Sequence, residues 1–173
     1  MATLFNTKTK ETITDFKILQ NFFKAQGVVL EKWEAKKILS KDSTQEEILA
    51  AYAHELKPYM ENHGYQDADV INVHPQTENL KMIREKFMQE HTHSDDEVRF
   101  FVDGAGVFWF NLEDDNVLSL KCEAGDFISV PKNVKHWFDL HPNYNVKCIR
   151  VFSNTDGWTP QYTKSGIDSK FNP

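Results

Sequence analysis

The segment EHTHSDDEVRFFVDG, residues 90–104, holds side chains that could do chemistry together. His91 and His93 are two residues apart, so on a β-strand both imidazoles point to the same face of the sheet. Glu97 has the same parity, and a buried strand tolerates its charge only where another group compensates it. His136 opens a further strand-like stretch after the glycine turn and apolar run of GDFISVPKNVKHWFDL. This pattern of three imidazoles and one carboxylate predicts a transition-metal site.

The donor set suits iron(II), nickel(II) or manganese(II) in a roughly octahedral site, and four protein ligands would leave two positions for solvent, substrate or oxygen. A structural zinc site, in contrast, is closed, tetrahedral and often contains cysteine. Cys122 and Cys148 lack the spacing of a metal or redox motif and lie inside strand-like stretches. We therefore expect both cysteines to be small buried core residues without a disulfide.

Arg99 lies two residues beyond Glu97 and shares its parity, which aims the guanidinium along the face of the candidate ligands. Two interpretations remain open for Arg99: contact with a substrate, which we favour, and a structural ion pair with Glu97, Asp95 or Asp96. We expect Asp95 and Asp96 to form the kink between His93 and Glu97 and to accept hydrogen bonds from metal-bound imidazoles. The opposite parity forms an apolar core face made of Val98, Phe100 and Val102.

The elements that must position these residues differ between the two halves of the chain. Residues 1–90 read as helices with short extended pieces. They include a helix in TDFKILQNFFKAQG that ends at Gly27, a capping box at Ser43-x-x-Glu46, a helix kinked or ended by Pro58, and a helix from about Thr77.

From His91 onward, short strands alternate with turn sequences such as GAG, EDDN and EAGD, which predicts an antiparallel sandwich or barrel. We place strands at 98–103, 107–112, 117–123, 127–130, 135–140 and 146–153. The chain is predicted to be a single mainly β domain over residues 1–173, with the helical part packing on a barrel centred on 91–155. The polar tail, residues 159–173, is expected to be loosely ordered.

The chain has a formal net charge of −6, so no global positive field attracts nucleic acid or an anionic membrane. No apolar run approaches the ~20 residues that span a bilayer, and the N-terminus lacks the apolar core of a signal peptide. We therefore predict a cytoplasmic protein with neither nucleic acid nor membrane as a ligand.

Two segments resemble the paired motifs of the cupin superfamily. They read His91-Thr92-His93, three residues, Glu97, six residues, Gly104, and then Gly125, five residues, Pro131, Lys132, Asn133, two residues, His136. The departures are Glu85 and Asn133 at glycine positions and Leu140 at an asparagine position. Asn133 should cost little, because asparagine tolerates a left-handed turn. The resemblance implies a cupin-type, jelly-roll-like antiparallel barrel flanked by helices.

KFMQEHTHSDDEVRFFVDGAGVFWF, GDFISVPKNVKHWFDL and RVFSNTDGW resemble the acireductone dioxygenases more closely, and GVVLEKW extends the similarity to the helical half. The resemblance implies that one Fe²⁺ or Ni²⁺ per monomer is held by His91, His93, Glu97 and His136. It implies that Arg99 contacts substrate and that Phe87, Phe138 and Trp158 line its pocket.

The reaction implied is cleavage of the enediol 1,2-dihydroxy-5-(methylsulfanyl)pent-1-en-3-one by O₂ in methionine salvage. The implied products are 4-methylsulfanyl-2-oxobutanoate and formate with iron, or 3-(methylsulfanyl)propanoate, formate and carbon monoxide with nickel. We expect a monomer. Two alternatives remain: another metal cupin enzyme, such as a sugar-phosphate isomerase or a different carbon-cleaving dioxygenase, and a non-catalytic binding module stabilised by its metal.

Overall fold

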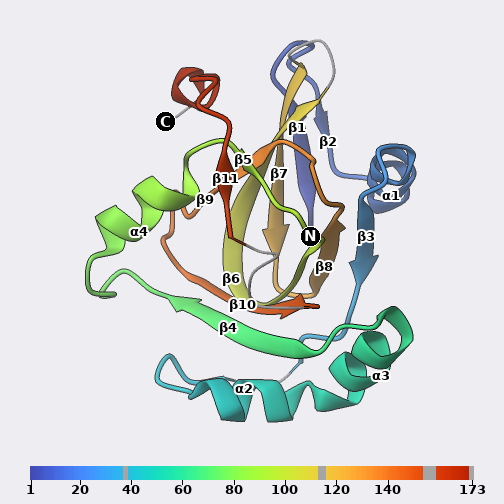
Figure 1. Ribbon diagram of the computed structural model, residues 1–173, viewed down its shortest axis with the longest axis vertical. Coiled ribbons are helices and arrows are strands. Elements are labelled where there is room, and N and C mark those ends of the chain that lie inside the picture. The colour runs from blue at the N-terminus through green and yellow to red at the C-terminus, as the bar shows by residue number, and fades with distance from the viewer. Residues whose placement is uncertain (37–38, 113–115, 154–158, 172–173) are drawn as a thin grey trace.

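A computed structural model describes residues 1–36, 39–112, 116–153 and 159–171. Its strands wrap around a common interior, and its helices lie on the outside (Figure 1). The strands are β1 (Thr3–Asn6), β2 (Thr12–Ile13), β3 (Val29–Lys32), β4 (Asp67–Val73), β5 (His91–Thr92), β6 (Glu97–Leu112), β7 (Asn116–Glu123), β8 (Asp126–Val130), β9 (His136–Asp139), β10 (Val146–Phe152) and β11 (Gln161–Tyr162). The helices are α1 (Phe16–Ala25), α2 (Gln45–Ala51), α3 (Ala53–His63) and α4 (Leu80–Phe87), followed by a 3-10 turn at Asp168–Lys170.

The two halves of strand β6 pair with different strands of the antiparallel sheet. Its first half pairs with β8 and β10, and its second half, from Ala105, pairs with β7 and β9. The prediction of a turn at GAG is wrong, because the strand continues through these residues. Gly104 has a φ of +68°, and a Cβ there would lie 2.1 Å from the carbonyl oxygen of Asn145. Glycine therefore lets β6 change partners where another residue would clash.

The two faces of β6 serve two cores, as its sequence parity predicts. Phe101 points into the barrel, where it joins Phe108 and Phe138 in the main core. Val98, Phe100 and Val102 point outward and pack beneath α2 and α3, which contribute Ile48, Tyr52 and Leu56. In Figure 1 these two helices lie along β4, on the side away from the barrel interior. The mainly β, cupin-type barrel flanked by helices is confirmed.

Local signals account for the start and end of α1. The Asp15 side chain accepts hydrogen bonds from the backbone N–H groups of Lys17 and Ile18, which have no partner within the helix. Gly27, with a φ of +76°, follows the helix as predicted. The helix buries Leu19 and Phe23 against the barrel core and leads into edge strand β3.

The helical segment after residue 43 differs from the prediction in two places. The capping box uses Thr44 and Glu47, one residue later than Ser43 and Glu46. Pro58 lies inside α3, and the interruption comes earlier, at Tyr52 between α2 and α3. Pro58 lacks the N–H that would bond the carbonyl of His54, so one bond near the start of α3 is lost without ending the helix.

The prediction of a loosely ordered tail is wrong for residues 159–171. Strand β11 pairs with β5, so that Tyr162 lies opposite His91. Ile167 and Phe171 pack with Trp137, on the outer face of the barrel. The pairing of β11 with the distant strand β5 therefore orders a segment whose polar composition is typical of a loop.

No helix in the described residues is long and apolar enough to cross a bilayer.

The capping box at the start of α2 can be tested with two neighbouring substitutions. We expect Thr44→Ala to lower the free energy of unfolding by about 1 kcal/mol, because it leaves the Glu47 N–H without its acceptor. Ser43→Ala is the matched control and should change it by less than about 0.5 kcal/mol. Urea titrations of both variants measure the difference, and an equal or larger loss for Ser43→Ala would place the cap at the other residue.

Candidate metal centre

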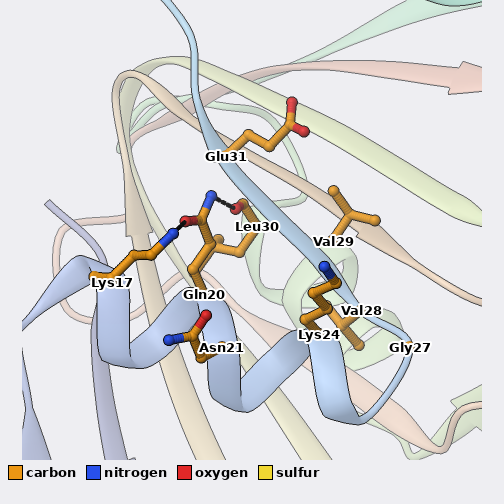
Figure 2. A pocket seen from close by; sticks show the side chains of 9 residues that line it. All are labelled: Lys17, Gln20, Asn21, Lys24, Gly27, Val28, Val29, Leu30 and Glu31. Carbon is orange, nitrogen blue, oxygen red and sulfur yellow. Dashed lines mark hydrogen bonds between the residues drawn. The ribbon is translucent and has the colours of Figure 1, made fainter.

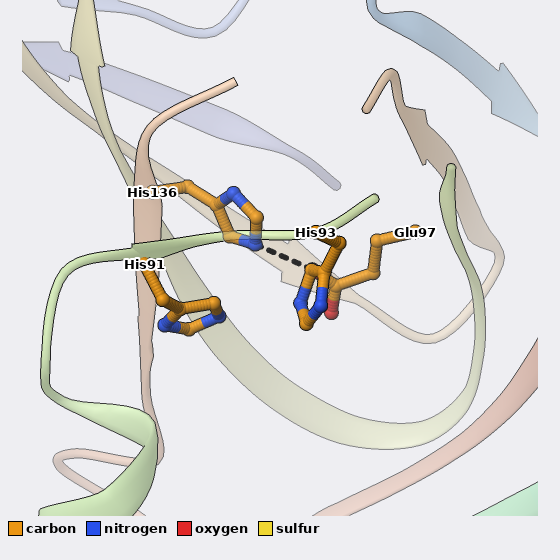
Figure 3. A group of neighbouring side chains, drawn as sticks. All are labelled: His91, His93, Glu97 and His136. Carbon is orange, nitrogen blue, oxygen red and sulfur yellow. Dashed lines mark hydrogen bonds and ion pairs between the residues drawn. The ribbon is translucent and has the colours of Figure 1, made fainter. Parts of the chain in front are cut away.

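Short strands bring the four predicted ligands together from distant parts of the chain. His91 opens β5 and lies directly opposite His136, which opens β9. His93 follows two residues later, and Glu97 is the first residue of β6. Figure 3 shows the imidazoles and the Glu97 carboxylate converging from these strands. The shared face expected from their parity is therefore present.

The donor atoms of His91, His93, Glu97 and His136 all lie within 4.8 Å of one another, and all four residues are buried. The Glu97 Oε2 lies 2.5 Å from Nε2 of His136 and 3.4 Å from Nε2 of His93. Ligands about 2.1 Å from one octahedral ion would lie roughly 3 Å apart when adjacent and about 4.2 Å apart when opposite. The spacing of the cluster is therefore close to what a bound transition-metal ion requires.

Backbone carbonyls orient two of the imidazoles. Nδ1 of His91 lies 2.6 Å from the carbonyl oxygen of Gln89, and Nδ1 of His136 lies 2.8 Å from that of Val134. A carbonyl only accepts, so each Nδ1 carries a proton, which leaves the Nε2 of each ring as the atom available to a metal. The prediction that Asp95 or Asp96 accepts from these two imidazoles is wrong.

Asp95 and Asp96 lie in the kink between His93 and Glu97, as predicted, and they fix this loop. The hydroxyl of Ser153 donates to Asp95, while the backbone N–H of Lys132 donates to Asp96 over 3.0 Å. These bonds connect the loop to the ends of β10 and β8. The two aspartates thus position the ligand-bearing segment through its backbone.

The electrostatics of the site favour the protonation states that a metal needs. Burial would raise the pKa of Glu97, but the charges of Arg99 and His136 and hydrogen bonds from His136 and His93 bring it well below its usual value. Burial and the neighbouring His136 lower the pKa of His91 to about 4. At neutral pH the cluster therefore presents an ionised carboxylate and, at His91, a neutral imidazole, which are the forms that ligate metals.

Arg99 forms an ion pair with Glu97 and keeps one nitrogen donor unpaired among the described residues. Its Nε donates to Oε1 of Glu97 over 2.5 Å, and its Nη2 contacts the same oxygen. The guanidinium carbon lies 4.9 Å from the ring centre of Phe138, an attractive cation–π arrangement. Nη1 is buried and has no hydrogen-bond partner in the described residues. The structural pairing with Glu97 is thus present, and one donor remains for another molecule.

A cavity of about 200 Å³ lies beside the histidines. Phe87 from α4 and Phe138 from β9 line it, as the family resemblance implies, together with His91, His93 and Arg99. The predicted third aromatic, Trp158, lies outside the described residues. The cavity thus combines apolar walls with the polar cluster at one side.

Four further lining residues were not predicted: Lys86, Arg150, Pro160 and Tyr162. Arg150 pairs with Asp69 through two nitrogen atoms. Pro160 and Tyr162 reach the cavity only because β11 pairs with β5. The pairing of segments about 70 residues apart leaves no local signal in the sequence.

Glu90 was also missed, although it precedes His91. Its buried carboxylate accepts hydrogen bonds from Thr163, Ser165 and Asn111, over 2.5, 2.7 and 2.7 Å respectively. Burial would raise the pKa of Glu90, but these three hydrogen bonds lower it overall. Glu90 thus anchors the C-terminal segment that walls the cavity.

A larger hollow of about 430 Å³ lies between α1 and β3, away from the histidines (Figure 2). Its polar side chains partner locally: Lys17 donates to Gln20, and Gln20 donates to the carbonyl of Leu30 over 3.0 Å. The hollow lacks the histidines that line the smaller cavity and belong to the four-residue cluster. The smaller cavity is therefore the candidate site for a reaction.

The barrel and the His–His–Glu–His cluster define a cupin-type protein with a metal centre. Residues 5–160 match the ARD/ARD' family. An acireductone dioxygenase of Picosynechococcus sp. is 53% identical over 99% of this chain and 97% of its own length. That of Aquifex aeolicus is 45% identical over 92% and 86%.

A solved structure agrees with this family. An acireductone dioxygenase from Bacillus anthracis, with a cadmium ion in its active centre, superposes with a TM-score of 0.87 and 35% identity, over 94% of this chain and 98% of that one. The chain therefore belongs to the ARD/ARD' family of acireductone dioxygenases and is an enzyme.

The depressed pKa of His91 predicts a pH dependence of stability in the metal-free protein. Its folded pKa of about 4 lies below the usual 6.5, so the unfolded chain binds the extra proton. The corresponding stability is present above pH 6.5 and is lost as the pH falls toward 4. From pH 7 to pH 5 we expect the free energy of unfolding to fall by about 2 kcal/mol more than in His91→Gln.

Urea titrations of both chelator-treated proteins at the two pH values give this difference. Equal losses in the two proteins would show that His91 is not held neutral by its surroundings.

Proposed function

We propose that this chain cleaves acireductone, 1,2-dihydroxy-5-(methylsulfanyl)pent-1-en-3-one, with O₂ in methionine salvage. With Fe²⁺ the products are 4-methylsulfanyl-2-oxobutanoate and formate. With Ni²⁺ they are 3-(methylsulfanyl)propanoate, formate and carbon monoxide. The observation that carries the proposal is the buried His–His–Glu–His cluster beside an apolar cavity, in a chain of the ARD/ARD' family. We place the enzyme in the cytoplasm as a monomer.

His91, His93, Glu97 and His136 hold the metal, one ion per monomer. When bound, the ion supplies positive charge for the ionised enediol and coordination positions beyond the four protein donors. The Nδ1 bonds of His91 and His136 to backbone carbonyls keep both rings aimed inward, which limits the reorganisation that binding costs.

Arg99 fixes the charge balance and orients the substrate. Its pairing with Glu97 holds that carboxylate in one position, and Nη1 is free to donate to an enediolate oxygen. A preorganised donor in a site shielded from water favours the charge that develops during cleavage. The same cation packs on Phe138, which limits its movement.

Phe87 and Phe138 form the apolar side of the cavity. Their rings meet edge to face, with centres 6.2 Å apart, and present carbon atoms to the space beside Arg99. The methylsulfanyl tail of the substrate is apolar, so its burial there releases water from both surfaces. We assign Trp158 to the same wall on the family resemblance, and Asp95 and Asp96 to positioning the ligand loop.

Metal exchange tests the proposed reaction. Chelator-treated protein reloaded with Fe²⁺ or Ni²⁺ receives acireductone anaerobically and then O₂, and the products are separated. We expect oxygen-dependent loss of acireductone well above the spontaneous rate, with carbon monoxide from the nickel form only. Metal-free protein is the control. Stoichiometric metal without any acceleration would retain the metal site and reject this substrate, leaving another cupin reaction or a binding module.

Arg99→Lys separates the substrate role from the structural role. Lysine keeps the charge but loses the planar set of donors, so we expect kcat/KM to fall about 100-fold at full metal content. Arg84→Lys is the control, because Arg84 pairs with Asp139 in the same two-nitrogen way but does not line the cavity. It should lower stability and keep turnover within a few-fold. Near-normal turnover of Arg99→Lys, with reduced stability, would make Arg99 purely structural.

A further inference from the structure

The cavity beside the metal centre is lined by three cationic side chains, and two of them are engaged. Arg99 places two nitrogens on Glu97. Arg150 places two nitrogens on Asp69, over 2.7 and 2.5 Å. Each guanidinium is therefore balanced by a carboxylate, so neither gives the cavity a net positive charge.

Lys86 is the third cation and differs from the other two. It lies in the last turn of α4, is exposed and also lines the cavity, which places it at the entrance. No carboxylate lies within ion-pair distance of its ammonium group in the described part of the chain. The nearest candidate in sequence, Glu85, faces Lys81 at 3.9 Å. Among the described residues that line the cavity, Lys86 is therefore the cation without a carboxylate partner.

The positive charge of Lys86 matches the negative charge of the proposed substrate, an inference that rests on the proposed function. An enediol conjugated to a ketone is a vinylogous acid, so acireductone is an anion at neutral pH. The protein has a net charge of −6, which opposes the approach of anions. The four metal ligands are buried, so the positive charge of an ion held by them would lie inside the protein, away from the entrance where the anion first arrives.

We propose that Lys86 is the entry cation of the active site, drawing the enediolate anion to the cavity and raising its rate of association. An exposed ammonium group is suited to this, because a strongly hydrated point charge acts over several ångströms without fixing a geometry. Lys86 then acts before chemistry begins, on kcat/KM rather than on kcat. Phe87, its neighbour in the chain, begins the apolar wall just inside.

The structural alternative is that Lys86 only stabilises α4, since a cation near a helix C-terminus interacts favourably with the helix dipole. That role affects unfolding and leaves association rates unchanged. Lys81 on the same helix is a matched control, because it is exposed but does not line the cavity.

Steady-state kinetics of the iron-loaded enzyme compare Lys86→Gln, Lys86→Glu and Lys81→Gln at low and high ionic strength. At about 10 mM salt we expect kcat/KM to fall roughly 3- to 10-fold in Lys86→Gln and further in Lys86→Glu, with kcat within about two-fold of wild type. The differences should nearly vanish at about 1 M salt, and Lys81→Gln should match wild type throughout. Unchanged kcat/KM in Lys86→Glu at low salt would overturn the proposal.

A second measurement needs no acireductone, so it separates this inference from the proposed reaction. Azide is the anionic probe and imidazole, uncharged at an assay pH of about 8.5, is the neutral one. Each is mixed by stopped flow with the Co²⁺-loaded protein while the cobalt absorption is followed. We expect Lys86→Glu to slow azide association several-fold at low salt and to leave imidazole association unchanged. Equal slowing of both probes would indicate a distorted entrance and reject the electrostatic role. If the wild-type enzyme does not turn over acireductone but Lys86→Glu still slows azide association, only the proposed reaction is rejected.

Discussion

The buried carboxylate of Glu97 is the constraint on which the site depends. It lies at the start of β6 and meets Arg99, His136 and His93. An isolated buried charge of this kind is strongly unfavourable, and the guanidinium compensates it while the imidazoles supply further polar contacts. Because each partner comes from a different turn or strand, satisfying this one group fixes how β5, β6 and β9 meet. The metal donors are thus brought together by the same interactions that make the charge tolerable.

Strand β6 transmits that constraint to the rest of the fold. One face holds Glu97, Arg99 and Phe101 toward the barrel interior, and the other holds Val98, Phe100 and Val102 against the helices. A shift by one residue would exchange the two faces, placing charge in the outer core and valines at the site. The two hydrophobic cores therefore maintain the register that points Glu97 and Arg99 toward the barrel interior.

The sequence was sufficient to predict those site residues whose side-chain direction depends only on their spacing along a strand. The spacing of His91, His93 and Glu97, with His136 after its turn, was sufficient to predict the cluster that the structure brings together. Prediction from the sequence failed where the outcome depends on distant pairing. Tyr162 and Glu90 acquire their positions from β11 pairing with β5, and the polar composition of the tail gave no sign of it. The glycines of GAG were read as a turn, because their sequence cannot distinguish a turn from a strand that changes partners.

The short strand β5 performs two tasks through its alternating faces. His91 points to the metal donors, while Glu90, immediately before it, binds Thr163 and Ser165 of the C-terminal segment. The wall of the cavity formed by Pro160 and Tyr162 is therefore anchored one residue from a predicted ligand. Releasing that wall would remove the Thr163 and Ser165 donors from the buried Glu90 carboxylate and leave it with Asn111 alone of the three, which is unfavourable for a buried anion. The position of the cavity wall and the placement of His91 thus depend on one local arrangement, in which the two-residue strand β5 pairs with β11 on one side and β9 on the other.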